Sequence, residues 1–464
     1  MKRVRPSEEE RRLAERVWRY VKERLEDTLA RRGIEASVTL QGSLAKDTWL
    51  SGELDVDVFV LFPVSWKARL GEAKELFREA FSDHVVEERH AAHPYIRVLV
   101  ENVWVDVVPA LRVERGDAAE TAVDRTPFHT EYIRSKLDDV QRDEVRLLKR
   151  FLKGIGVYGA EVAVKGFSGY AAELLIVAYG CFRYVLEKAA RWKPPVVIDV
   201  EGHYGGSLPR IVEHFGETHM VIVDPVDPRR NVAAAISKRS MAWFVLASRL
   251  YLREPSLHYY WPPPYPDEPV ELLHAAGPRA WRILAAVYHF EPNTPPDVAW
   301  GALQAAARRI ESFSTESGLR VLDSTVYYCE GDATGLLLVE YEHLEQRNWL
   351  LHRGPEAWLD ERPERFIDRV LERGEPGPWI CGDASLCSLR ERSVNLRSYA
   401  ERGAPKRAKL AWAGLLGDAV LEGVLERVCT EARREAYRFV VKRPAWLEAL
   451  RIGRRSYRTP RARR

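Results

Sequence analysis

The sequence predicts a multidomain α+β protein, and three observations lead to this class. The chain has 464 residues, which is enough for about three domains. Apolar residues make up 46% and charged residues 30%, so each domain can bury a core. Runs with the spacing of strands gather in residues 36–108 and 282–343, whereas helical patterns dominate residues 137–253.

Residues 1–135 are predicted to form a small α+β domain with a mixed or antiparallel sheet. The first element is a helix over 7–32, because Ser7 and Glu10 form a capping box and Gly33 ends an apolar stripe of helical spacing. The remaining elements are strands at about 36–41, 54–62, 95–101 and 103–108, and a helix near 67–82.

Residues 136–257 are predicted to form a mostly helical central domain. Two short apolar runs, "PPVVIDV" and "MVIVD", interrupt the helical patterns. The segment that follows, 258–272, contains five prolines, which exclude regular structure and indicate a linker. The helical patterns themselves cover 137–154, 168–190, 207–215 and 231–253.

Residues 273–464 are predicted to form a C-terminal α+β region. A β-α-β-β order is expected there, which is typical of split βαβ units. After it, residues 355–408 are expected to be irregular, and a helical block over about 409–450 is expected to end the fold. The β-α-β-β order consists of a strand at 282–290, a helix at 296–316 and strands at 319–328 and 334–343.

Composition narrows the class of protein. The net charge is only +3, so a nucleic-acid partner must be held by local basic patches, such as the seven arginines of residues 451–464. Five cysteines without zinc-ligand spacing predict no disulfide framework and a reduced, cytoplasmic protein. The N-terminus lacks the apolar core of a signal peptide, and no association with a membrane is expected.

Two aspartates stand in an apolar run that reads as a buried strand. Asp55 and Asp57 are two residues apart, so in a strand they project to the same face. Like charges on one face repel, unless a divalent cation lies between them, and carboxylate oxygens suit Mg²⁺. Asp106 is the one acid in a second apolar strand, 102–111. If the two strands are neighbours, the three aspartates supply the ligands of a two-metal site.

A Gly-Ser pair precedes the aspartates. Gly42 and Ser43 open a short helical segment, where backbone N–H groups and a hydroxyl form a cradle for an anion. A cradle beside carboxylates predicts a site for a phosphate together with a metal.

These motifs resemble the nucleotidyltransferase superfamily of DNA polymerase β, and more closely the archaeal-type (class I) CCA-adding enzymes, which are tRNA nucleotidyltransferases. The resemblance is dense over residues 40–240 and thinner after them, as in "PPDVAWGALQAAARRI". It rests on the blocks "GSLAKDTWLSGELDVDVFVLFP", "TAVDRTPFHTEYI", "LLKRFLKGIGVYGAEVAVKGFSGYAAELL" and "DPVDPRRNVAAAIS".

The resemblance implies a role for each matching position. Asp55, Asp57 and Asp106 match the catalytic carboxylates, and Arg229 or Arg230 matches an arginine associated with base selection. Family members often have Glu where Asp55 stands and Arg where Lys46 stands, and both differences keep the charge. Nucleotide-binding positions are matched by Gly42, Ser43, Lys46, His129, Lys149 and Tyr158.

The implied activity is the template-independent addition and repair of the 3′-terminal CCA of tRNA from CTP and ATP, with two Mg²⁺ ions and release of pyrophosphate. The β-α-β-β region then resembles the RRM-like layout of the family's tRNA-binding body, and the family suggests a homodimer. Two alternatives stay open. One is another template-free RNA nucleotidyltransferase, such as a poly(A) polymerase or an oligoadenylate synthetase. The other is an inactive relative that only binds RNA.

Overall fold

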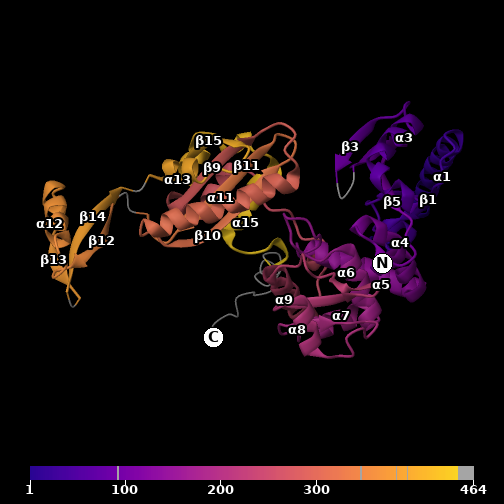
Figure 1. The fold of residues 1–464 in the computed structure, drawn as a ribbon, viewed down its shortest axis with the longest axis horizontal. Helices are drawn as coiled ribbons and strands as arrows, with labels where there is room; N and C mark the ends of the chain where they lie inside the picture. The colour runs from indigo at the N-terminus through magenta and orange to yellow at the C-terminus, as the bar shows by residue number, and fades with distance from the viewer. Residues whose placement is uncertain (91–93, 345–346, 383, 394, 448–464) are drawn as a thin grey trace, which may run out of the picture. The chain divides into compact units, whose positions relative to one another are not determined.

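The computed structural model describes residues 1–90, 94–344, 347–382, 384–393 and 395–447 (Figure 1). The chain divides into two compact units, Met1–Pro262 and Pro263–Ile452. The boundary between the units falls inside the predicted proline-rich linker, 258–272. That segment is not wholly irregular, because a 3₁₀ turn, Leu257–Tyr259, overlaps its start and the helix α10 (Pro269–Ala276) begins before its end. The predicted separation of residues 1–135 from 136–257 stays a prediction, and so does the Arg-rich patch at 451–464, which lies outside the described residues.

The first unit begins with α1 (Glu8–Arg31), which has the predicted capping box between Ser7 and Glu10. The core of this region packs α1 and α3 (Ala73–Ala80) against the sheet. The predicted mixed sheet is confirmed, since β2 and β5 run parallel and the other pairs run antiparallel. Its order is β1 (Ser37–Gln41), β2 (Val56–Phe62), β5 (Val103–Leu111), β4 (Pro94–Val100) and β3 (Val86–His90).

Two predictions for this sheet need correction. The edge strand β3 was missed, because its sequence "VEERH" is too charged to read as a strand. The helix expected near 67–82 is a 3₁₀ segment, Val64–Glu72, followed by the short α3.

The rest of the first unit is mostly helical, as predicted. The helix expected over 168–190 is two helices, which bend by 93° at a break beside Gly180, whose φ is +85°. The helix expected over 231–253 starts seven residues later, because Asn231 ends strand β8, residues 232–235 form a turn and Ser237 caps the helix. The elements are α4 (Ala122–Lys136), α5 (Asp139–Gly154), α6 (Gly169–Tyr179), α7 (Phe182–Ala189), β6 (Val196–Ile198), α8 (Leu208–Phe215), β7 (Met220–Asp224), β8 (Asp227–Asn231) and α9 (Lys238–Arg253).

The second unit contains the predicted β-α-β-β order. A four-stranded antiparallel sheet has the order β10-β11-β9-β15, and α11 packs on it. The helix α15 packs on the sheet through a separate core cluster. The bounds are α10 (Pro269–Ala276), β9 (Ile283–Phe290), α11 (Pro296–Glu316), β10 (Val321–Cys329), β11 (Thr334–Tyr341), β15 (Ala408–Leu415), α14 (Leu416–Leu421) and α15 (Thr430–Val441).

Two predictions for the second unit are wrong. Residues 355–408 are not irregular, because they hold α12 (Arg362–Glu372), β13 (Trp379–Cys381), β14 (Ser385–Ser393) and α13 (Leu396–Arg402). Strand β14 pairs with β12 (Arg347–Glu356) and β13 in a small separate sheet. The final helical block starts only after β15, since pairing with β9 overrides the helix-like composition of "AKLAWAGL".

The prediction of no disulfide framework is also wrong. Cys329 at the end of β10 is bonded to Cys429, the residue before α15, and Cys381 is bonded to Cys387. The first pair is 100 residues apart, so local spacing in the sequence could not reveal it.

Within the described residues, no single helix is both long and apolar enough to cross a bilayer, and only the bent pair α6–α7 meets that test by length and composition.

Candidate active site

The parallel pairing of β2 and β5 brings two of the predicted catalytic aspartates together. Asp57 and Asp106 are direct partners across the two strands. Asp55 lies one residue before β2 rather than inside the strand, and its side chain is 54% exposed. The sheet therefore holds one pair in register and leaves the third carboxylate at the strand entrance.

Arg97 joins the third carboxylate to the pair. It lies on β4 directly opposite Asp106. Its Nη2 is 3.6 Å from Asp55 Oδ1, and its Nε is 3.1 Å from Asp106 Oδ1, without hydrogen-bonding geometry. Sequence reasoning missed Arg97, because nothing in the run "HPYIRVLV" marks it as a partner of an acid on another strand.

The charged forms of Asp57 and Asp106 are disfavoured at this position, because both carboxylates are buried beside other acids. Burial, followed by the charges of Asp55 and Asp106, raises the pKa of Asp57 to about 7. Burial also raises the pKa of Asp106, against the opposing effect of Arg97. The Oδ1 atom of Asp106 is buried and accepts no hydrogen bond.

These features fit a divalent cation, which would neutralise the carboxylates and use hard oxygen ligands. Among the residues that the structure describes, no three His, Cys, Asp or Glu side chains are already gathered closely enough to hold a metal ion. The metal-binding role of the three aspartates therefore stays a prediction.

The Gly-Ser pair lies against the carboxylates, as the sequence suggests. Gly42 begins α2 (Gly42–Ala45) with φ +68°, a conformation that side chains disfavour. A Cβ atom at this position would lie 1.8 Å from Asp57 Oδ2. Only glycine lets the backbone of the cradle approach the acid so closely, and Ser43 follows it at the start of α2.

Two lysines with predicted roles in nucleotide binding share a buried carboxylate. Lys46 Nζ is 2.6 Å from Glu173 Oε2, and Lys149 Nζ is 2.9 Å from Glu173 Oε1. Burial alone would raise the pKa of Glu173, but Lys149 and Lys46 lower it to about 2. Thr48 also donates to Glu173, at 2.6 Å. The cluster of two ammonium groups and one carboxylate keeps one net positive charge, which suits a phosphate.

Tyr158 lies beside this cluster. A Cβ atom at Gly169 would meet the Tyr158 hydroxyl at 3.0 Å and Lys149 Nζ at 3.7 Å, so glycine leaves room for both side chains. Lys153 Nζ lies 5.0 Å from the centre of the Tyr158 ring. The predicted Lys149 and Tyr158 are thus neighbours in space.

His129 belongs to a second buried cluster. Its Nε2 is 2.8 Å from Asp224 Oδ2, and its ring stacks on Tyr170 with centroids 4.1 Å apart. Arg230 donates to the same carboxylate at 2.8 Å, whereas Arg229 lies by Asp227 with Nε 3.3 Å from Oδ1. Sequence reasoning missed Asp224 and Glu173 as partners, although both are acids inside strongly apolar runs.

The matches to known proteins cover both parts of the first unit. Residues 19–129 match the family "nucleotidyltransferase domain", and residues 143–261 match "tRNA nucleotidyltransferase, second domain". The CCA-adding enzyme of Saccharolobus shibatae is 37% identical over 418 residues, which cover 88% of this chain and 92% of that one.

This chain belongs to the family of CCA-adding enzymes. The CCA-adding enzyme of Sulfurisphaera tokodaii is 38% identical, covering 89% of this chain and 92% of its own, and that of Pyrobaculum islandicum is 36% identical, covering 87% and 92%. A solved cytoplasmic RNA terminal U-transferase is similar at 16% identity with a TM-score of 0.43, over 55% of this chain and 91% of its own.

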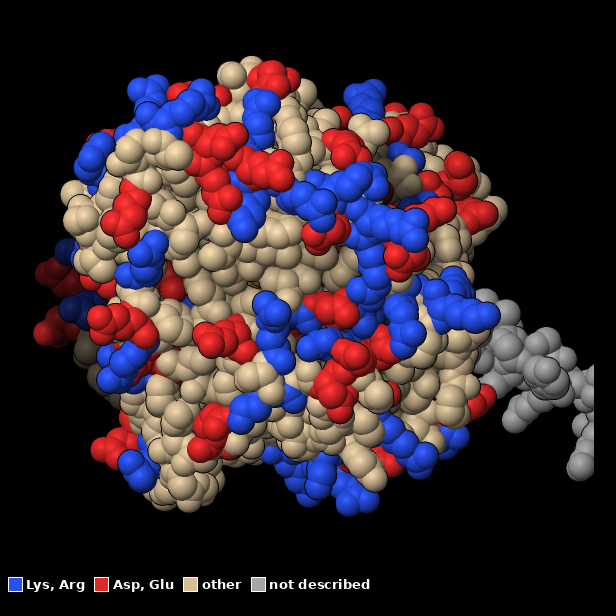
Figure 2. Space-filling view, turned by 90° about the vertical axis from the view of Figure 1, so that its right-hand side faces the viewer, with Lys and Arg blue, Asp and Glu red and all other residues tan. Residues whose placement is uncertain are grey.

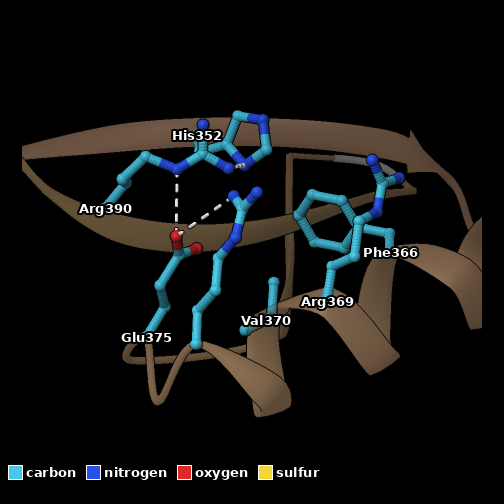
Figure 3. Close-up of a pocket in the computed structure, with 7 residues that line it drawn as sticks. His352, Phe366, Arg369, Val370, Glu375 and Arg390 are labelled. Atoms are coloured by element: carbon cyan, nitrogen blue, oxygen red, sulfur yellow. Dashed lines mark hydrogen bonds and ion pairs between the residues drawn. The ribbon is translucent and has the colours of Figure 1, made fainter.

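The second unit of this chain also has a basic pocket. Figure 3 shows His352 and Arg390 on the strand side, with Phe366, Arg369 and Val370 on the helix side. Arg390 Nε donates to Glu375 Oε1 at 2.9 Å, and Arg373 lies 3.7 Å from the same oxygen. Two arginines pair with Glu375, and Arg369 adds a third positive charge to the lining, so cations outnumber the single carboxylate around the pocket. The face in Figure 2, by contrast, intersperses Lys and Arg with Asp and Glu.

Proposed function

We propose that this chain adds C-C-A to the 3′ end of tRNA from CTP and ATP, with Asp55, Asp57 and Asp106 holding two Mg²⁺ ions. The RNA 3′-hydroxyl oxygen bonds to the α-phosphorus, the bond from that phosphorus to pyrophosphate breaks, and the hydroxyl proton passes to a carboxylate or water. Bound Mg²⁺ would neutralise the triphosphate and lower the pKa of the hydroxyl. The observation that supports this proposal is the in-register pairing of Asp57 with Asp106 against Gly42.

The chain's own residues position the triphosphate. The short helix at Ser43 offers backbone N–H groups, and Lys46 and Lys149 supply positive charge that Glu173 holds in place. Tyr158 and His129 extend this surface toward the ribose and base. Preorganised charges of this kind act without rearranging during the reaction.

We further propose that the second unit binds the tRNA through its backbone phosphates. Supporting features are the arginine-lined pocket and three exposed basic residues of "KRAK" at the start of β15, namely Lys406, Arg407 and Lys409. Salt should then weaken tRNA binding steeply. The RRM-like role of the four-stranded sheet, a homodimer and action in the cytoplasm stay predictions.

The test offers the full-length protein Mg²⁺, CTP, ATP and a tRNA transcript that lacks CCA. We expect addition of C, C and A followed by a stop, since an enzyme of the poly(A) polymerase kind would continue with A. The variant Asp106→Asn should lose this activity, whereas Glu101→Gln, in the turn between β4 and β5, should keep it. Equal rates for wild type and Asp106→Asn, or products longer than CCA, would overturn the proposal.

A further inference from the structure

We propose that Asp224 is a positioning residue for nucleotide recognition: its carboxylate fixes Arg230 and His129 beside the nucleotide, and leaves the neighbouring Arg229 outside the site. This inference rests on the proposed function, because it concerns how the same site distinguishes CTP and ATP from other nucleotides.

Asp224 has the contacts that such a role requires. It ends β7, and its side chain is 0% exposed. Its Oδ2 accepts from His129 Nε2 and Arg230 Nη1, both at 2.8 Å. Its Oδ1 accepts from the Tyr170 hydroxyl at 3.2 Å and the Val226 N–H at 3.1 Å. Four donors on one carboxylate fill its lone-pair positions, so the carboxylate cannot turn without breaking a bond.

The groups held by Asp224 are only partly enclosed. The Arg230 side chain is 35% exposed, although one of its nitrogens is tied to the buried acid. A guanidinium has five N–H donors in a fixed plane, so the rest of the group can donate to the edge of a base. His129 uses Nε2 toward the carboxylate, which in the neutral ring leaves Nδ1 as an acceptor.

This cluster adjoins the phosphate end of the site. Lys46 Nζ lies 5.8 Å from the centre of the Tyr170 ring, and that ring stacks on His129. A nucleotide with its phosphates at Lys46 would therefore extend its ribose and base along His129, Tyr170 and Arg230.

Arg229 provides the contrast. Adjacent residues of β8 point to opposite faces, and each arginine has a buried aspartate of its own. Asp227 lies 3.3 Å from Arg229 Nε and 3.0 Å from Arg125 Nη2. Arg229 is 66% exposed and donates to the backbone oxygen of Asp117. Asp227→Asn is therefore a matched control: it neutralises a buried acid on the same hairpin that does not hold Arg230.

The experiment measures kcat and KM for CTP and ATP, and the rate of UTP and GTP incorporation, on tRNA lacking CCA. We expect Asp224→Asn to raise KM about 10-fold or more, because it removes a hydrogen bond between charged groups. The value of kcat should change less. Incorporation of wrong nucleotides should rise relative to CTP and ATP. Asp227→Asn should stay within about 2-fold of wild type in these kinetic constants, because Asp227 pairs with Arg229 and Arg125 and not with Arg230 or His129.

A double-mutant cycle separates positioning from mere stability. If Asp224 acts through Arg230, the KM effect of Asp224→Asn should largely disappear when Arg230→Lys is already present. Should Asp224→Asn fail to fold, Arg230→Lys alone decides, because lysine keeps the charge but not the planar contact. The inference would be overturned if Arg230→Lys had the KM and selectivity of wild type. It would also be overturned by equal defects in Asp224→Asn and Asp227→Asn, or by fully additive effects of Asp224→Asn and Arg230→Lys on KM. A wild-type protein that adds no CCA would instead overturn the proposed function.

Discussion

At the scale of single residues, the candidate site contains one carboxylate whose charge is disfavoured in the folded state and another whose charge is stabilised there. Asp57 is kept among like charges and has a pKa of about 7, whereas Glu173 is compensated by two lysines and has a pKa of about 2. Carboxylates with strongly shifted pKa values are typical of functional sites, which are often less stable than the rest of the fold.

The variant Asp57→Asn should be inactive yet more stable without metal. An acid with a raised pKa destabilises the fold increasingly as pH rises from about 4 to about 7, because its charged form is disfavoured there. We expect the variant to raise Tm by about 2–4 °C in EDTA at pH 8, which corresponds to about 1 kcal/mol. The gain should vanish near pH 4, where both side chains are neutral. A lower Tm for Asp57→Asn at pH 8 would contradict the raised pKa.

Gly42→Ala should abolish nucleotide addition. The new Cβ would collide with Asp57 Oδ2, and the residue would keep a positive φ. Gly33→Ala is the matched control, since Gly33 has φ +61° but open space around it. We expect the control to lose only about 1 kcal/mol of stability, the cost of the backbone conformation, with normal activity. Equal activities of the two variants would show that the close approach to Asp57 does not matter.

At the scale of elements, α5 ties the loop after α2 in place. Arg146 is 2% exposed, and its Nε donates to the Trp49 carbonyl at 3.0 Å and its Nη2 to that of Asp47 at 2.5 Å. One turn later Lys149 donates to the carbonyl of Thr48 at 3.2 Å. One helix face thus holds three consecutive residues that follow Lys46.

Arg146→Met should therefore raise KM for nucleotides and lower the free energy of unfolding. Loss of the Arg146 guanidinium leaves Asp47 and Asp143 with fewer partners, and breaking a buried ion pair costs about 3 kcal/mol of stability. Arg142→Met is the control on the same helix, because its partner Asp139 is 92% exposed and the pair should be worth less than about 1 kcal/mol. Denaturant unfolding and nucleotide kinetics check both variants. Similar losses in the two variants would refute a special role for Arg146.

The elements also show what the sequence could and could not predict. Helix α1 and the strands carrying Asp57 and Asp106 follow from local caps and apolar runs, so they were predicted. Strand β15 was not, because only its pairing with β9 makes it a strand. The roles of Glu173 and Asp224 escaped for the same reason: their partners Lys46 and His129 lie 127 and 95 residues away.

At the scale of the whole molecule, the second unit contains a disulfide bond that the cysteine content did not predict. The Cys329–Cys429 bond joins the end of β10 to the start of α15 across 100 residues. In the loop-entropy description, a closed loop of this length stabilises the fold by up to about 4.7 kcal/mol, and the six-residue separation of Cys381 and Cys387 gives less.

Cys329→Ser with Cys429→Ser should lower the Tm of the second unit by more than Cys381→Ser with Cys387→Ser does. Calorimetry with and without reductant measures this, and mass spectrometry after alkylation counts free thiols. The Cys329–Cys429 bond would be contradicted if its double variant had the Tm of wild type. Both disulfides would be contradicted by four alkylated thiols at these positions in the untreated protein.

The central claim is that the carboxylates of Asp55, Asp57 and Asp106 gather divalent metal against a nucleotide. Titration of Mn²⁺ into the full-length protein, followed by electron paramagnetic resonance in the presence of CTP, tests it most directly. The account predicts protein-bound Mn²⁺ in wild type and its loss in Asp57→Asn, while Glu101→Gln binds as wild type does. Unchanged Mn²⁺ binding in Asp57→Asn would contradict the claim.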